Sequence, residues 1–302
     1  MKRFAVIDLG TNTFHLVIVQ QNTAGQLTEV HRERIYVRLA EEGIAKIGAA
    51  PFQRALDAMQ KFHKILSANS VTTIKAFGTA ALRTASNASE FISKVKATTG
   101  IQIDIIPGQE EARLIYLGVK QVVNFHQGHD LIMDIGGGSV EFIIANEDGV
   151  QWAESFPIGV AVLHHQFHKN EPISSIEIET LKSHLKTTLT SLSNILREFP
   201  VTKLIGASGT FDVLADNLVK EKQHTHMVAF PVAFFFPLHE EIVKMTLEER
   251  LQKDKLPASR ADMIVVALLL IRYILELTGV EEIVVSDYAM KEGMLQEFAE
   301  SR

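Results

Sequence analysis

The sequence contains no cysteine, and this absence excludes disulfides, thiolate nucleophiles and cysteine-based zinc or iron–sulfur sites. A chain without disulfides suits a reducing compartment, so a cytoplasmic location is predicted. Long apolar runs are also missing. The two most apolar windows, residues 229–238 and 263–277, are shorter than the ~20 residues that a membrane-spanning helix needs. The N-terminus reaches Asp8 before an apolar run long enough for a signal peptide has formed, so neither export nor membrane association is expected.

A surplus of positive charge is likewise absent, because the formal net charge is −6. Broad electrostatic attraction to nucleic acid is therefore not expected, and a polyanionic ligand would have to be held by a local site. The chain is 302 residues long and 46% hydrophobic. That length exceeds the usual size of one hydrophobic core, so two domains are predicted.

An internal repeat is the most informative feature of the sequence, since residues 6–19 align with residues 132–145 without a gap. Each copy has an apolar run with an aspartate (Asp8, Asp134), a glycine (Gly10, Gly136), a short polar turn and a second β-rich run. This pattern predicts a strand, a tight turn and a returning strand. Two such units indicate two related domains that face each other.

Strands alternate with helices between and after the repeats, which is typical of an α/β fold. Strands are predicted at 101–106, 203–206 and 282–286, and long helices at 174–199 and 259–278. The periodicity is lost at 124–129, so the domains are predicted as 1–124 and 125–302. The last helix, 288–302, could pack back on the first domain.

Three turns have the composition of phosphate-binding sites. A turn rich in glycine or threonine exposes consecutive backbone N–H groups in a concave nest, and the third turn also opens a helix, whose positive dipole end favours anions. One such turn alone is commonly just a glycine turn, but three in one chain favour a phosphate ligand. The candidate residues are Gly10, Thr11, Asn12, Thr13, Gly136, Gly137, Gly138, Ser139, Gly206, Ser208, Gly209 and Thr210.

Carboxylates accompany these turns: Asp8 and Asp134 precede them, and Glu141 stands on the second returning strand. A carboxylate beside bound phosphate is repulsive unless a hard cation bridges the two groups, so Mg²⁺ or another divalent cation is predicted. Glu141 could instead be an ordinary solvent-facing strand residue. The acidic pair Glu110 and Glu111 could likewise serve only to complement a helix dipole.

Six motifs in this order resemble the exopolyphosphatase/guanosine pentaphosphate phosphatase family, from the first strand to the last helix. They are residues 8–16 (DLGTNTFHL), 108–116 (GQEEARLIY), 134–141 (DIGGGSVE), 206–210 (GASGT), 260–262 (RAD) and 286–288 (SDY). The resemblance implies the fold of actin, Hsp70 and the sugar kinases, with two ribonuclease H-like domains and an active site between them. It also implies metal-dependent hydrolysis of a terminal phosphate.

By the same resemblance, Glu111 matches the catalytic carboxylate and would be the general base that activates water. Asp134, Gly136, Gly138 and Glu141 match the second phosphate and metal segment. Arg83 matches an arginine that would hold the polyanion, and Arg38 is a less specific candidate for that role. Val140 departs from the pattern because many relatives carry threonine there.

Several functions remain open at this point. The first is an exopolyphosphatase acting on inorganic polyphosphate, and the second is a guanosine pentaphosphate 5′-phosphohydrolase. A sensor that binds these ligands without turnover, or a sugar or acetate kinase, would be different classes of protein. Longer relatives continue into a further helical domain, so weak grip on long polymers is expected here. A homodimer could offset that weakness.

Overall fold

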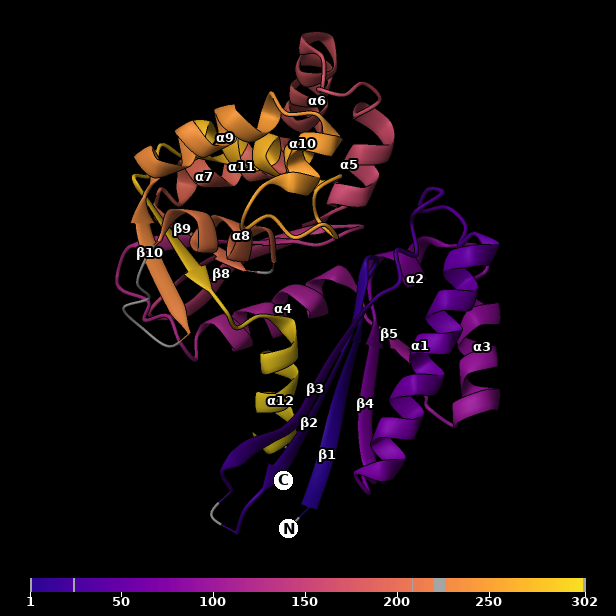
Figure 1. Ribbon diagram of the computed structural model, residues 1–302. Helices are drawn as coiled ribbons and strands as arrows, with labels where there is room; N and C mark the ends of the chain where they lie inside the picture. Colours follow the sequence, from indigo (N-terminus) through magenta and orange to yellow (C-terminus); the bar gives the residue numbers. More distant parts are fainter. Residues whose placement is uncertain (1, 24, 208, 220–225, 301–302) are drawn as a thin grey trace.

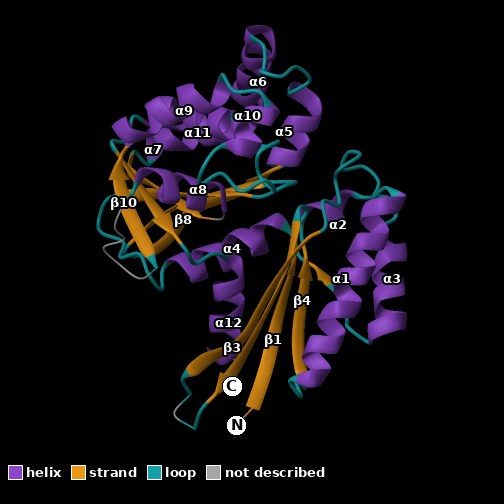
Figure 2. Ribbon diagram, viewed as in Figure 1, coloured by secondary structure: helices purple, strands orange, loops and turns teal. Residues whose placement is uncertain are grey.

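The computed structural model describes residues 2–23, 25–207, 209–219 and 226–300, which form two lobes (Figure 1). Each lobe is built on one β-sheet with helices packed beside it (Figure 2). Both marked ends of the chain lie beside the first lobe, because the last helix, α12 (Met290–Glu300), returns to it (Figure 1). The ring of Phe298 on this helix stacks on Phe4 of the first strand, with 4.0 Å between ring centroids.

The first sheet has the strand order β3-β2-β1-β4-β5, and the second has the order β10-β11-β9-β6-β7-β8. The strands are β1 (Lys2–Leu9), β2 (Thr13–Gln21), β3 (Leu27–Tyr36), β4 (Thr73–Gly78), β5 (Asp104–Ile105), β6 (His129–Ile135), β7 (Val140–Asn146), β8 (Gly149–Phe156), β9 (Val201–Ala207), β10 (Met227–Pro231) and β11 (Glu282–Ser286).

The two sheets repeat one design. β1 pairs antiparallel with β2 and parallel with β4, and β6 pairs antiparallel with β7 and parallel with β9. The second sheet adds β10 as an antiparallel edge strand. In register, Asp8 stands opposite His15 and Asp134 opposite Glu141. The repeat read from the sequence is thus a structural repeat, and the predicted α/β fold of two related halves is confirmed. The division at residue 124 stays a prediction.

The helices are α1 (Ala49–Ala68), α2 (Ala80–Thr84), α3 (Ala88–Thr99), α4 (Gly108–Val119), α5 (Val160–Phe167), α6 (Ser175–Thr188), α7 (Thr190–Glu198), α8 (Gly209–Leu218), α9 (Phe235–Val243), α10 (Leu247–Gln252), α11 (Ile264–Thr278) and α12. A 3-10 turn at Val232–Phe234 precedes α9. Helices α1 and α3 lie together beside the first sheet, and α4 lies between the lobes (Figure 1).

One buried apolar cluster joins the two lobes. It contains Val6 and Val17 from the first sheet, Ile143 from the second sheet, and Leu114 and Met294 from α4 and α12. Two further clusters fill most of each lobe, one between the first sheet and α1 and α3, and the other around α11, which also reaches Ala40. Burial of such apolar surface is the main favourable term in folding, so the joining cluster fixes the two halves against each other.

Three predicted elements differ in extent from those observed. The helix expected over 174–199 is two helices that meet at the buried Leu189. The strand expected over 101–106 pairs only at Asp104–Ile105, although buried and exposed residues partly alternate along it. Residues 259–263 form turns rather than helix, since the Arg260 N–H donates to the Pro257 carbonyl and the Met263 N–H to the Arg260 carbonyl. In the part of the chain that is described, no helix is long and apolar enough to cross a membrane.

A buried histidine on α9 should make stability depend on pH. His239 is 3% exposed, and burial together with the charge of the nearby Arg272 lowers its pKa to about 4. Between the unfolded pKa near 6.5 and the folded value, only the unfolded chain binds the proton, so stability is lost as pH falls through this window. Between pH 7 and pH 5, the free energy of unfolding of the His239→Leu variant should therefore fall by roughly 2 kcal/mol less than that of the wild type, as measured by urea unfolding. Equal losses would show that His239 is protonated in the folded protein.

Candidate functional site

A cleft of about 500 Å³ lies at the ends of β1 and β6, where both glycine-containing turns of the repeat meet. The predicted residues that line it are Asp8, Gly10, Thr11, Asn12, Thr13, Glu111, Asp134, Gly136, Gly137, Gly138, Ser139, Glu141 and Gly209. They come from both halves of the sequence. The cleft therefore has the composition expected of an interdomain site.

The two hairpin turns contact each other across the cleft. A Cβ on Gly137 would lie 2.7 Å from the side chain of Asn12, so only glycine allows this approach. Asn12 belongs to the turn that the Gly10 N–H closes by donating to the Thr13 carbonyl at 3.1 Å. Thr11 Oγ1 and Asn12 Oδ1 are buried, and neither has a hydrogen-bond partner among the described residues. Buried polar atoms without partners are costly, which is consistent with a ligand at this position.

The third predicted turn contributes less to the cleft. Gly209 lines it, Thr210 lines a smaller neighbouring cavity, and Gly206 lies under the ring of Phe211 instead. Gly206 is thus close-packed, because a Cβ there would meet the Phe211 ring at 2.0 Å. Ser208 lies outside the described residues.

Four carboxylates share the inner part of the cleft: Asp8, Glu111, Asp134 and Glu141. Burial and the neighbouring charge of Glu111 raise the pKa of Asp8 to about 8, although the charge of Lys291 opposes the shift. Burial also raises the pKa of Glu141 well above its usual value, and the charges of Glu111 and Asp134 add to this effect. Like charges at close range cannot all ionise without a compensating cation.

Glu141 is not a solvent-facing strand residue, since it is only 1% exposed. Its Oε1 accepts hydrogen bonds from the hydroxyls of Ser139 at 2.6 Å and Ser155 at 2.7 Å. These two hydroxyls fix the carboxyl group between the turn after β6 and strand β8. The second carboxyl oxygen is left for other partners.

Glu111 stands at the first turn of α4 and is 8% exposed. Burial raises its pKa to about 7; the charge of Arg83 opposes the shift, whereas Asp134 adds to it. Arg83 Nη1 donates to Glu111 Oε2 at 2.7 Å and to the Ile106 carbonyl at 2.9 Å. A carboxylate with a pKa near neutrality inside a cleft has the properties of a general base.

The two predicted arginines do not line the cleft. Arg83 instead borders an adjoining pocket on the other side of Ser139. Arg38 has a left-handed backbone, with φ 51°, and its guanidinium pairs with Asp262 of the second lobe. Arg83 thus positions Glu111, and Arg38 links the two lobes.

Four cations line the cleft: Arg32 and Arg34 on β3, Arg260, and Lys291 on α12. Sequence reasoning placed Arg260 in a family motif without a role and missed the other three. Arg32 and Arg34 are two residues apart on one strand, so their side chains share a face of the sheet. This spacing could have identified them from the sequence as a pair of cations. Burial and the charge of Arg34 lower the pKa of Arg260. Cations that repel one another in a cleft favour an anionic ligand.

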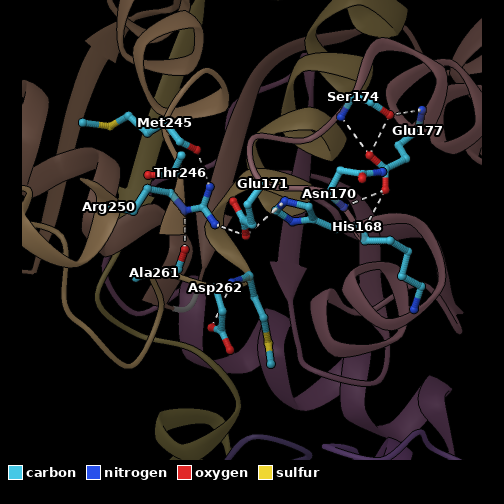
Figure 3. Close-up of polar contacts among 12 residues, drawn as sticks. His168, Asn170, Glu171, Ser174, Glu177, Met245, Thr246, Arg250, Ala261 and Asp262 are labelled. Carbon is cyan, nitrogen blue, oxygen red and sulfur yellow. Dashed lines mark hydrogen bonds and ion pairs between the residues drawn. The ribbon is translucent and has the colours of Figure 1, made fainter. Parts of the chain in front are cut away.

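Hydrogen bonds and an ion pair of the buried Arg250 hold the turn that carries Arg260 (Figure 3). Arg250 is fully buried, and its Nε donates to the Ala261 carbonyl at 2.6 Å. Its Nη2 donates to Glu171 at 2.7 Å, and its Nη1 donates to the Met245 carbonyl at 2.7 Å. Ala261 lies between the cleft residue Arg260 and the interlobe residue Asp262, so this network fixes both.

The donor set fits a hard divalent cation, because the inner cleft offers carboxylate oxygens with raised pKa values. Among the described residues, however, no three Asp, Glu or His side chains converge closely enough to enclose a metal ion. Asp8, Asp134 and Glu141 therefore do not form a preformed three-ligand cage. Mg²⁺ commonly binds through one or two carboxylates and completes its shell with phosphate oxygens and water, which this arrangement permits.

Comparison with solved structures shows the same fold. An exopolyphosphatase from Cytophaga hutchinsonii is 35% identical, with a TM-score of 0.94 over 99% of this chain and 98% of that one. A Ppx/GppA family member from Aquifex aeolicus is 25% identical, with a TM-score of 0.80 over 100% and 99% of the two chains.

Curated relatives carry two activities in their names. Exopolyphosphatase 1 of Mycobacterium tuberculosis is 26% identical over 97% of this chain and 87% of the relative. A guanosine-5′-triphosphate,3′-diphosphate pyrophosphatase of Aeromonas hydrophila is 28% identical over 97% of this chain, which spans 58% of that longer protein. The model of the Ppx/GppA phosphatase family matches residues 17–302. With the repeated hairpins, the carboxylate-lined cleft and this match in agreement, the chain belongs to the Ppx/GppA phosphatase family.

Proposed function

We propose that this protein is an exopolyphosphatase that hydrolyses the terminal phosphoanhydride bond of inorganic polyphosphate. The observation that carries the proposal is that carboxylates and cations line one cleft together. Glu111, Asp8, Asp134 and Glu141 line the same cleft as the cations Arg32, Arg34, Arg260 and Lys291. A chain of phosphates would place its terminal group near the carboxylates and its next groups near the cations.

The roles follow from position. The backbone N–H groups of the turns after β1 and β6 would bind the terminal phosphate, and Glu111 would accept a proton from the attacking water. Arg83 keeps the Glu111 carboxylate oriented through its bond at 2.7 Å. Asp134 and Asp8 would hold Mg²⁺, with Glu141 as a third candidate ligand. When bound, the cation would neutralise charge on the phosphoryl oxygens. A cytoplasmic location, as the absence of cysteine suggests, is part of the same proposal.

Three further carboxylates, Asp212, Asp216 and Asp287, also line the cleft, so it is not uniformly basic. Few phosphates behind the terminal one would then be held strongly, because each carboxylate near the chain repels it. We therefore expect distributive action on long polyphosphate. Limiting enzyme should shorten a uniform long polymer gradually, as resolved on a gel, and full-length polymer beside fully degraded product would contradict this expectation.

A second substrate is guanosine pentaphosphate, since one group of relatives is named for it. The decisive comparison is kcat/KM for polyphosphates of graded length and for guanosine pentaphosphate under the same conditions. Polyphosphate should give the higher value, because the cations lining the cleft recognise phosphate groups and not a base. A higher value for the nucleotide would replace the proposed substrate, and binding without any phosphate release would revive the sensor function.

A further inference from the structure

A second cavity adjoins the catalytic end of the cleft, and we call it the side pocket. It has a volume of about 340 Å³, which is room for roughly ten water molecules. Its lining residues include Arg83, Thr84, Gly108, Gln109, Ser155 and Val162. Two of these, Arg83 and Thr84, belong to α2 of the first lobe, and Ser155 belongs to β8 of the second.

The cleft and the side pocket adjoin each other. Three small residues, Ala80, Gly138 and Ser139, line both cavities. A Cβ on Gly138 would lie 2.7 Å from the Ala80 Cβ and 2.6 Å from Thr11 Oγ1, which shows how closely these segments meet. Gly138 is thus enclosed by the side chains of Thr11, Ala80 and Ile44, and its lack of a side chain allows this close approach.

An ion pair also connects the two cavities. Glu111 lines the cleft, and Arg83, bonded to it at 2.7 Å, lines the side pocket. Among the described residues, the Arg83 guanidinium donates its two hydrogen bonds from Nη1. Its other N–H groups can therefore serve an anion, and an arginine presents them in a geometry that suits phosphate. The side pocket thus has a fixed positive group next to the site of hydrolysis.

The reaction creates a need for such a site, and this step rests on the proposed function. Water attacks the terminal phosphorus, its proton passes to Glu111, and the bridging P–O bond breaks with the electron pair leaving on the shortened chain. Orthophosphate is then formed beside Glu111, at the inner end of the cleft. While the shortened polymer is still bound, it occupies the path back to the open side. Even in distributive action, orthophosphate without another exit would therefore leave only after the polymer does.

We infer that the side pocket is a product site, which binds inorganic orthophosphate through Arg83 and releases it to solvent while polymer still occupies the cleft. Passage requires the shared residues Gly138 and Ser139 to shift, a local opening of the kind that commonly limits product release. Thr84 is exposed at the border of the pocket and forms no part of the catalytic machinery. A bulky side chain there should obstruct the route without touching Glu111.

The test compares Thr84→Trp with Thr98→Trp, a matched substitution at an exposed position of α3 that does not line the pocket. In Thr84→Trp the first turnover should keep its wild-type rate, while steady-state kcat falls about tenfold and a burst of phosphate appears. Thr98→Trp should behave as the wild type. In the wild type, added orthophosphate should lower kcat, because it can bind to the side pocket while polyphosphate occupies the cleft. In Thr84→Trp, added orthophosphate should no longer lower kcat.

Two outcomes would overturn the inference. One is strictly competitive inhibition of the wild type by orthophosphate, and the other is an unchanged kcat in a folded Thr84→Trp variant. If Thr84→Trp fails to fold or slows the first turnover, Val162→Phe and the inhibition pattern of the wild type decide the question. If the wild type releases no phosphate from any polyphosphate, the proposed function itself is wrong. If Thr84→Trp releases phosphate without a burst, only the inference about the side pocket is wrong.

Discussion

Replacing Glu111 by glutamine is expected to lower kcat by about 10²- to 10⁴-fold while leaving substrate affinity nearly unchanged, because a general base contributes a factor of this size. Glutamine keeps the size of the side chain and an oxygen that can accept the hydrogen bond from Arg83 Nη1. What it loses is the ability to take the proton from water. The affinity should be measured directly with a polyphosphate of defined length, and kcat by phosphate release.

The neighbouring residue provides the control for this experiment. Glu110 precedes Glu111 in the first turn of α4, but its carboxylate is bonded to Arg113 at 2.7 Å and does not line the cleft. Glu110→Gln should therefore retain nearly full activity. If Glu111→Gln keeps more than about a third of wild-type kcat, the assignment of the base is wrong, since the loss would be far below what such a group contributes.

The same assignment predicts a pH profile. Because the base must be deprotonated and burial raises the pKa of Glu111 to about 7, kcat/KM should rise with pH and level off above that value. The residual activity of Glu111→Gln should lack this rise. A profile that is flat between pH 5 and pH 8 in the wild type would place the base elsewhere.

Much of the fold could be predicted from the sequence because its signals are local. The aligned repeat specified both hairpins, and β11 was predicted with its observed bounds. Elements whose sequence shows no such regularity were predicted less well. The turns at 259–263 are an example, because the buried guanidinium of Arg250 holds the Ala261 carbonyl, a contact that no sequence period shows.

Within the candidate site, the same distinction applies. The turns and carboxylates lie in contiguous motifs, so residues such as Asp134 and Glu141 could be located directly. Lys291 comes to the cleft only because α12 folds back on the first lobe, where Phe298 stacks on Phe4. Arg83 was recognised from its motif, but the motif does not show which way its side chain points. Whether it faces the cleft or supports Glu111 depends on which side of α2 packs against the Ile106 backbone.

Removal of divalent cations is expected to abolish phosphate release, because the inner cleft otherwise brings bound phosphate against Asp8, Asp134 and Glu141. The charge of Asp134 already contributes to the raised pKa values of both Asp8 and Glu141. Adding phosphate without a cation would add further repulsion, whereas a cation bridging carboxylate and phosphate makes the contact favourable. Activity should return when Mg²⁺ is restored, and full activity in excess chelator would contradict the metal requirement.

Asp134→Asn tests which carboxylate holds the cation. Asparagine keeps the shape of the side chain but removes its charge, so the Mg²⁺ concentration for half-maximal activity should rise by about tenfold or more, as losses at metal sites commonly do. Asp148→Asn is the matched control, because Asp148 is exposed in the turn between β7 and β8 and does not line the cleft. Direct titration with Mg²⁺ in the presence of orthophosphate gives a second readout that does not depend on turnover. Equal Mg²⁺ requirements in the two variants would remove Asp134 from the ligands, and a raised requirement in Asp8→Asn alone would assign the cation to the first hairpin.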